Sequence, residues 1–378
     1  MKNNCAIYIH IPFCDHKCIY CDFYSIITSD NVDNFLTSLS KEIKFFAEKY
    51  SNGREFSSIF FGGGTPSLMH SDYIKTIIGE LNKNFNIYSD SEITIETNPG
   101  TVNLKKLKEF RQSGINRISI GIQSFNEDEL KFLTRIHDKE TAIQTVYHAV
   151  DAGFENISID LIFNLPGQTK EKWKSNLHTV VSLPITHLSA YSLILEQGTI
   201  LNKMVLDGKV KIQDEDYDAE LYKSTIEFLI KSGFKQYEVS NFAKPGYECI
   251  HNKAYWEHRE YLGFGTSAHS FMNGKRWWNF SSLKRYISEI ENNSQAVMNE
   301  EVPTEKQLHD EYIMLALRSK GIILNEYLSR FKSDWINKNY SYFETLKIEN
   351  FLKMDNNTIY LTPKGYSVCD EILKNILH

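Results

Sequence analysis

The stretch YIHIPFCDHKCIYCDFYS, residues 8–25, holds three of the six cysteines in the chain: Cys14, Cys18 and Cys21. It begins inside a short alternating run, residues 5–11, that predicts a β-strand. The three thiols follow this run at the spacing CxxxCxxC, so all of them lie on one loop. Three thiols placed directly after a first strand predict a metal site at the end of that strand.

Three thiolates on one loop suit a particular kind of metal site. A structural zinc ion needs four closed ligands, so a zinc site here would have to recruit His10 or His16. A [4Fe-4S] cluster held by only three cysteines keeps one iron open to bind another molecule. We expect the cluster, with a zinc site and unligated thiols as the alternatives.

The composition of the 378-residue chain is that of a globular protein, with 42% hydrophobic residues and a net charge of -6. We find no apolar run near the roughly 18 to 20 residues of a membrane span, and the N-terminus lacks the pattern of an export signal. The expected location is therefore the cytoplasm, where thiols stay reduced and clustered cysteines are metal ligands before they are disulfides. Peripheral contact at the inner membrane face stays an open alternative. The acidic balance without a dense basic run argues against nucleic acid as a partner.

Outward from the opening stretch, strand and helix patterns alternate. Helical periodicity, as in residues 34–50 and 141–153, separates six short β-branched runs. These runs are residues 5–11, 57–63, 92–98, 117–123, 157–163 and 187–193. The alternation predicts an α/β fold with parallel strands. Because no GxGxxG follows the first strand, we expect an incomplete TIM-type (β/α)6 barrel rather than an open Rossmann sheet.

The alternation fades after about residue 242, which predicts three parts: a barrel over residues 1–242, a linker region over 243–302 and a C-terminal module over 303–378. The last part has two helical patterns and a hairpin pattern that turns at Asn356 and Asn357. Helices with one hairpin predict a small winged-helix-like α+β module. Its acidic and basic residues balance, so we expect packing or contact with a protein partner rather than DNA binding.

Unusual polar groups occur at the carboxyl ends of the predicted strands. They are Gly63, Gly64 and Thr65 after the second strand, Glu96 in the third, Gln123 in the fourth and Asp160 in the fifth. The carboxyl ends of barrel strands converge on one face and form the site. A carboxylate in an apolar strand needs a partner such as an amine or a hydroxyl. We therefore expect a ligand site at this face, with a tight glycine turn and ion pairs at the rim as the alternatives.

The motifs around these residues resemble those of a known family. CDHKCIYC, residues 14–21, is similar to the radical S-adenosylmethionine (SAM) signature, and YIHIPFC, FFGGGTPS, ETNPG, GIQSF and DLIFNLPGQT accompany it. Together they resemble the oxygen-independent coproporphyrinogen III oxidase family over the whole chain. The resemblance implies that the open iron of the cluster binds SAM. It also implies that an electron, from a donor such as flavodoxin or ferredoxin, releases a 5'-deoxyadenosyl radical from it.

The same resemblance implies which residues contact SAM. These are Tyr8, Tyr20, Gly63, Gly64, Thr65, Glu96, Gln123, Arg135 and Asp160. Judged from the residues alone, Arg135 is the weakest of them, because an arginine next to KFLT is usually a solvated part of a helix.

Two features separate branches of this family. The oxidases carry a fourth cysteine two residues after the third, and here that position is Phe23, which cannot take part in proton or hydrogen-atom transfer as a thiol does. Residues 251–256, HNKAYW, resemble the HNxxYW motif of the heme chaperone branch. His251 is an ordinary type of axial heme ligand, and Tyr255 and Trp256 could pack on the macrocycle. The alternative is a structural histidine among aromatic residues, which is the more common case.

The expected function is therefore heme binding and transfer by a protein that also holds the cluster and SAM and lacks coproporphyrinogen III oxidase activity. The resemblance implies heme-accepting partners such as membrane respiratory enzymes. The alternative function is oxidative decarboxylation of coproporphyrinogen III, and Phe23 argues against it.

Overall fold

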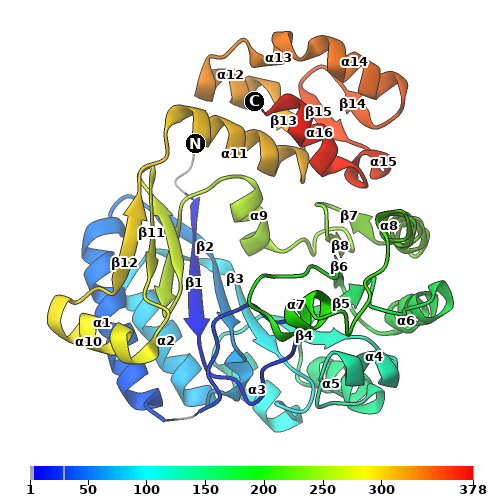
Figure 1. Cartoon of the computed structure of the whole chain (residues 1–378). Helices are drawn as coiled ribbons and strands as arrows, with labels where there is room; N and C mark the ends of the chain where they lie inside the picture. Colours follow the sequence, from blue (N-terminus) through cyan, green and yellow to red (C-terminus); the bar gives the residue numbers. More distant parts are fainter. Residues whose placement is uncertain (1–3, 29, 378) are drawn as a thin grey trace.

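The computed structural model describes residues 4–28 and 30–377 (Figure 1). Its first half alternates strands and helices as the sequence predicts. In chain order the elements are β1 (Asn4–Ile11), α1 (Val32–Tyr50), β2 (Glu55–Gly63), the 3-10 helix η1 (Pro66–Leu68), α2 (Ser71–Asn84), β3 (Ile87–Thr97), α3 (Leu104–Gln112), β4 (Arg117–Gln123), α4 (Glu127–Phe132), α5 (Lys139–Asp151), β5 (Asn156–Phe163), α6 (Lys170–Ser182) and β6 (His187–Ser192). β1 to β6 pair in this order and every pair is parallel. The expected α/β fold with a partial (β/α)6 barrel is confirmed.

The barrel strands separate apolar from polar side chains. In β4, Ile118, Ile120 and Ile122 belong to the main buried core, which also contains residues of the outer helices. Burial of each such side chain stabilises the fold by about 1.5–3 kcal/mol. Arg117 and Ser119 alternate with them and therefore face the inside of the barrel. Figure 1 shows α1 to α6 around the outside of the sheet.

The segment 243–302, expected as a linker, adds strands to the same sheet. After α7 (Ile200–Leu206), α8 (Glu215–Lys231), β7 (Lys235–Gln236) and β8 (Asn241–Ala243) come α9 (Ile250–Trp256), β9 (Tyr261–Gly265), β10 (His269–Met272), β11 (Lys275–Asn279), α10 (Leu283–Asn293) and β12 (Val297–Glu301). β9 pairs in parallel with β1, and β10 to β12 continue antiparallel from it. The resulting mixed sheet has the order β12-β11-β10-β9-β1-β2-β3-β4-β5-β6-β8-β7. The division of the chain at 242 and 302 stays a prediction.

The C-terminal module has a hydrophobic core of its own. Its elements are α11 (Glu305–Leu317), β13 (Ile322–Ile323), α12 (Leu324–Phe331), α13 (Trp335–Lys338), α14 (Tyr340–Ile348), β14 (Leu352–Met354), β15 (Thr358–Leu361), α15 (Pro363–Tyr366) and α16 (Cys369–Ile376). β14 and β15 form the predicted antiparallel hairpin, and β13 completes a small sheet. The module lies above the end of the barrel that carries α9 (Figure 1).

Candidate functional site

A cavity of about 410 Å³ opens at the carboxyl ends of the barrel strands. Nearly all the residues predicted to bind the cluster and SAM line it. They are Cys14, Cys18, Tyr20, Cys21, Gly63, Gly64, Thr65, Glu96, Gln123, Arg135 and Asp160. Tyr8 and His251 are not among the lining residues. The fold thus brings together side chains that are spread over about 150 positions of sequence, as expected for the convergent face of a parallel barrel.

The cysteine loop is tied to the barrel at both of its ends. Cys14 N–H donates to the carbonyl of Ile26 at 2.9 Å, and Ile26 N–H donates to the carbonyl of Pro12 at 2.8 Å. Cys14 Sγ lies 3.2 Å from Thr65 Oγ1, and Arg135 Nη1 donates to Cys18 Sγ at 3.5 Å. Cys14, Cys18 and Cys21 are half-buried and are not in disulfides. All three cysteines therefore line the cavity with thiols that are not in disulfides.

The zinc alternative needs ligands that meet at one point, including a fourth from His10 or His16. In the described part of the chain, no three His, Cys, Asp or Glu side chains gather closely enough to hold one metal ion. A zinc ion needs its ligands around a single point, whereas each cysteine of a [4Fe-4S] cluster binds a different iron. His10, one proposed fourth zinc ligand, is buried, and its Nε2 is bonded to the carbonyl of Tyr24 at 2.9 Å.

Gly63 lets β1 pack closely against the end of β2, and Gly64 does the same for the start of the cysteine loop. Gly63 has φ +110°, and a Cβ there would lie 2.8 Å from the ring of His10. A Cβ on Gly64 would lie 2.6 Å from the carbonyl oxygen of Phe13. Both distances are shorter than van der Waals contact. Both positions therefore need glycine because of these close contacts, and both residues also line the cavity.

Two interacting carboxylates, Glu96 and Asp160, line the cavity. Burial and the neighbouring Asp160 raise the pKa of Glu96 to about 8, although the Gly63 N–H and Arg117 oppose this. Burial also raises the pKa of Asp160, and its carboxylate accepts from Ser119 Oγ at 3.3 Å. Paired carboxyl groups with raised pKa values are typical of functional sites. A cationic ligand next to them would stabilise their charged forms.

Arg135 lies inside the site rather than on a solvated helix. Its Nη2 donates to Asn98 Oδ1 at 2.7 Å and to the carbonyl of Gly121 at 2.6 Å. Asn98 Nδ2 in turn donates to Thr65 Oγ1 at 3.0 Å. Asn98 is therefore a site residue that the sequence analysis did not single out, although the motif ETNPG at the end of the third strand contains it. Gln123 follows a bulge in β4 and has φ 69°, a conformation that non-glycine residues rarely adopt.

Tyr8 stands behind the cavity wall. Its hydroxyl group is hydrogen-bonded to His10 Nδ1 at 3.2 Å, and the His10 ring packs against Gly63. Burial, and then the negative charge of Glu96, raise the pKa of Tyr8. Tyr8 is thus close to the predicted SAM residues and supports them from the strand side.

His251 lies near the other end of the barrel from the cavity. Helix α9 carries it (Figure 1), and its side chain is 1% exposed. Its Nδ1 is bonded to Ser58 Oγ and its Nε2 to the hydroxyl of Tyr255, each at 3.0 Å. The ring stacks on Phe60 at 4.9 Å between centroids. Burial, with a smaller effect of Arg117, lowers the pKa of His251 to about 3, so the imidazole is neutral.

Phe23 occupies the mouth of the cavity. Its side chain is 62% exposed and lines the cavity together with Cys21. This is the position at which a fourth cysteine is expected in an oxidase. The structure therefore places an apolar ring at the point where that thiol would face the cavity.

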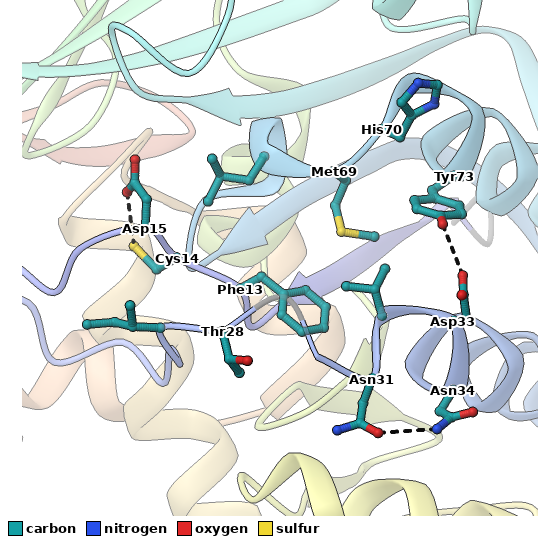
Figure 2. A pocket seen from close by; sticks show the side chains of 13 residues that line it. Phe13, Cys14, Asp15, Thr28, Asn31, Asp33, Asn34, Met69, His70 and Tyr73 are labelled. Carbon is teal, nitrogen blue, oxygen red and sulfur yellow. Dashed lines mark hydrogen bonds between the residues drawn. The ribbon is translucent and has the colours of Figure 1, made fainter.

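A second, larger cleft of about 860 Å³ lies on the other side of Cys14 (Figure 2). It lies between the cysteine loop, η1 and the first turns of α1 and α2. Its polar groups bond one another: Tyr73 hydroxyl donates to Asp33 Oδ1 at 3.0 Å, and Asn34 Nδ2 donates to Asn31 Oδ1 at 3.2 Å. The smaller cavity is therefore the better candidate, because its polar groups converge on the open space.

The helices in the described residues include none that is both long and apolar enough to span a membrane.

Comparisons with a family profile, with known sequences and with solved structures agree with one another. The family profile described as the radical SAM superfamily matches residues 8–180. A protein of Lactococcus lactis named "Heme chaperone HemW" is 34% identical, and the match covers 100% of this chain and 98% of that protein. Its namesake in Bacillus subtilis is 33% identical over 97% of both chains. The structure of Escherichia coli coproporphyrinogen III oxidase (HemN) superimposes with a TM-score of 0.84 at 24% identity, covering 100% of this chain and 90% of the other, which is a similarity of fold.

Proposed function

The chain belongs to the HemW heme chaperone family of radical SAM proteins, and on this premise we propose that it binds heme and transfers it to heme-requiring proteins. The observation that carries the proposal is the similarity to proteins of that name over essentially the full length of both chains. Phe23 at the mouth of the cavity supports the same choice, because coproporphyrinogen III oxidation in the related enzymes is expected to need a thiol there.

We further propose that Cys14, Cys18 and Cys21 hold a [4Fe-4S] cluster. When bound, this group supplies an open iron for SAM and the electron that can break its sulfonium bond. The chain's own contribution is to keep three thiols on one wall and to shield them. Arg135 Nη1 donates to the Cys18 sulfur and so holds this side chain in place at the cavity.

In this proposal SAM occupies the cavity. Glu96 and Asp160 provide negative charge for its cationic groups, and Gly64 and Thr65 leave room close to the backbone. Arg135 offers a guanidinium group, which suits a carboxylate. Tyr20, Gly63 and Gln123 complete the wall, and Tyr8 supports it through His10. Whether SAM is cleaved, with flavodoxin or ferredoxin as the electron donor, stays a prediction.

For heme we propose His251 as an axial ligand. A neutral imidazole is the form that binds iron, and burial keeps His251 neutral. Binding through either ring nitrogen requires that nitrogen to leave its present partner, Ser58 or Tyr255. Loss of one such hydrogen bond costs about 0.5–1.5 kcal/mol, which an iron–imidazole bond can offset. Helix α9 must therefore shift or open when heme binds.

The test uses the full chain, reconstituted anaerobically with iron and sulfide. We expect iron and sulfide in the ratio of a [4Fe-4S] cluster, SAM binding, and a heme Soret band that shifts on titration. His251→Ala should weaken that shift, whereas His70→Ala, at a side chain that is 67% exposed, is the matched control and should not. In parallel, coproporphyrinogen III should not be decarboxylated. Appreciable decarboxylation would favour the oxidase instead.

Partners and location complete the proposal. Membrane respiratory enzymes are the expected class of heme acceptor, and the cytoplasm is the expected compartment. Transfer of heme to an apo-cytochrome, followed by its absorption spectrum, is the direct measurement.

A further inference from the structure

The part of the barrel interior near the starts of the strands is polar. We call it the closed half, and we call the part that contains the cavity the open half. Ser58, Glu92, Arg117, Ser158 and His187 come from β2 to β6, and all of them are buried. Barrel interiors are usually filled with branched apolar side chains. Arg117 is the unexpected member of this set, because a buried charge is costly unless it is paired. Its side chain is 2% exposed.

One partner of Arg117 anchors the helix that carries the HNxxYW motif. Arg117 Nε lies 3.8 Å from Glu92 Oε2. Glu92 also accepts three hydrogen bonds from the start of α9: from Cys249 Sγ at 3.3 Å and from the backbone N–H groups of Ile250 and His251, each at 3.1 Å. Glu92 can accept these bonds as a buried carboxylate because Arg117 compensates its charge.

The other partners of Arg117 belong to the open half. Arg117 and Ser119 lie on the same face of β4, two residues apart. Ser119 pairs in register with Glu96 of β3, and its Oγ donates to Asp160 at 3.3 Å. Burial raises the pKa values of Glu96 and Asp160, and the positive charge of Arg117 lowers both. Within the described part of the chain, Arg117 Nε has no hydrogen-bond partner. Glu92 therefore does not occupy all the hydrogen-bond donors of the guanidinium group. Charge acts over several ångströms in an interior of low dielectric constant. Arg117 therefore influences both ends of the barrel.

We propose that Arg117 is a positioning residue shared by the two ends: it holds α9 through Glu92 and places a positive charge on the barrel face that carries Glu96 and Asp160. The proposal rests on the proposed function, in which the cavity binds SAM, whose sulfonium and amino groups are cationic. Arg117 acts through the carboxylates, which face the cavity, and not by contact with the ligand.

SAM affinity as a function of pH tests the role at the cavity. The charged and titratable groups that act on Glu96 are Asp160 from β5, Tyr8 from β1 and Arg117 from β4, and Arg135 acts on Asp160. Glu96 becomes charged as the pH rises through about 8. SAM binding, measured by calorimetry on the anaerobically reconstituted full chain, should strengthen over that range. In Arg117→Met the rise should move to higher pH, with binding near neutral pH weakened by up to about tenfold.

A second variant separates this role from a role in folding. Arg117→Met alone leaves Glu92 buried without its counter-charge, and such a change is often strongly destabilising. The double variant Arg117→Met/Glu92→Gln removes both charges, so it should fold and keep its cluster while showing the same shift in the pH profile. Arg117→Lys keeps the positive charge and should stay near the wild-type profile. A folded double variant with the wild-type profile overturns the proposal. If the wild-type protein binds no SAM at any pH, the proposed function fails instead.

Hydrogen exchange tests the role at α9. In the double variant the amides of residues 250–256 should exchange faster, because a neutral glutamine is a weaker acceptor for the start of the helix. Glu96→Gln, which changes only the open half, should leave that exchange unchanged. Unaltered exchange of α9 in the double variant overturns the shared role of Arg117.

Discussion

The close packing of the cysteine loop on β2 can be tested with a single methyl group. In Gly64→Ala the new Cβ would lie 2.6 Å from the carbonyl oxygen of Phe13 and 3.1 Å from that of Ile11. Both atoms belong to the backbone, so neither can turn aside as a flexible side chain would. Gly64 N–H donates to the Ile11 carbonyl and Thr65 N–H to the Phe13 carbonyl, each at 2.8 Å. The methyl group must push these strands apart, and overpacking of this kind costs about 1–3 kcal/mol.

Because Cys14 directly follows Phe13, we expect Gly64→Ala to lose cluster as well as stability. The assays are urea unfolding under anaerobic conditions and the iron and sulfide content after reconstitution. Gly79→Ala is the matched control: Gly79 lies in α2, and a Cβ added there would meet nothing within 4 Å, so the same substitution should stabilise by about 0.5–1 kcal/mol. A Gly64→Ala protein with wild-type stability and full cluster content would refute the packing argument.

Three further predictions concern other contacts. Arg135→Lys removes the paired hydrogen bonds to Asn98 and the Gly121 carbonyl and should weaken SAM binding about tenfold by calorimetry, with Arg111→Lys as the control. Burial would raise the pKa of Glu311, but His258 and Arg276 lower it to about 2. The charged carboxylate of Glu311 therefore stabilises the fold above its ordinary pKa of about 4.5, and this stabilisation is lost as the pH falls toward 2. At neutral pH the melting temperature of Glu311→Gln should be lower than that of the wild-type protein, and near pH 2 the two melting temperatures should be equal. Thr225→Val leaves the buried Trp173 Nε1 without its acceptor at 2.7 Å and should cost about 1–3 kcal/mol in urea unfolding, and an unchanged midpoint would contradict this.

The barrel strands could be predicted from the sequence because each has a clear period of two. Residues 117–123 were predicted as a strand and form β4 with the same bounds. The strands between residues 243 and 302 were not predicted, and β9 shows why. It contains two glycines, and Gly263 packs so closely on β10 that a Cβ would lie 2.0 Å from the carbonyl of His269. Glycine weakens a strand pattern in sequence, while the close contact that requires it is visible only in three dimensions.

The cavity could be predicted because the carboxyl ends of parallel strands lie at the same face of the barrel. Asn98 was missed because an asparagine before a proline and a glycine is typical of a turn. Its bonds to Arg135 and Thr65 join segments far apart in the chain. The surroundings of His251 escaped prediction for the same reason: Ser58, which holds Nδ1, is 193 positions away in the sequence.

If heme and SAM bind as proposed, α9 would connect the two sites through Glu92 and Arg117. If His251 leaves Ser58 or Tyr255 to bind iron, α9 shifts, and its N-terminal donors loosen from Glu92. Glu92 is also the carboxylate that pairs with Arg117, so a change at the start of α9 would alter the surroundings of Arg117. If heme binding changes the affinity of the cavity for SAM in this way, thermodynamic linkage requires SAM to change the affinity for heme by the same factor.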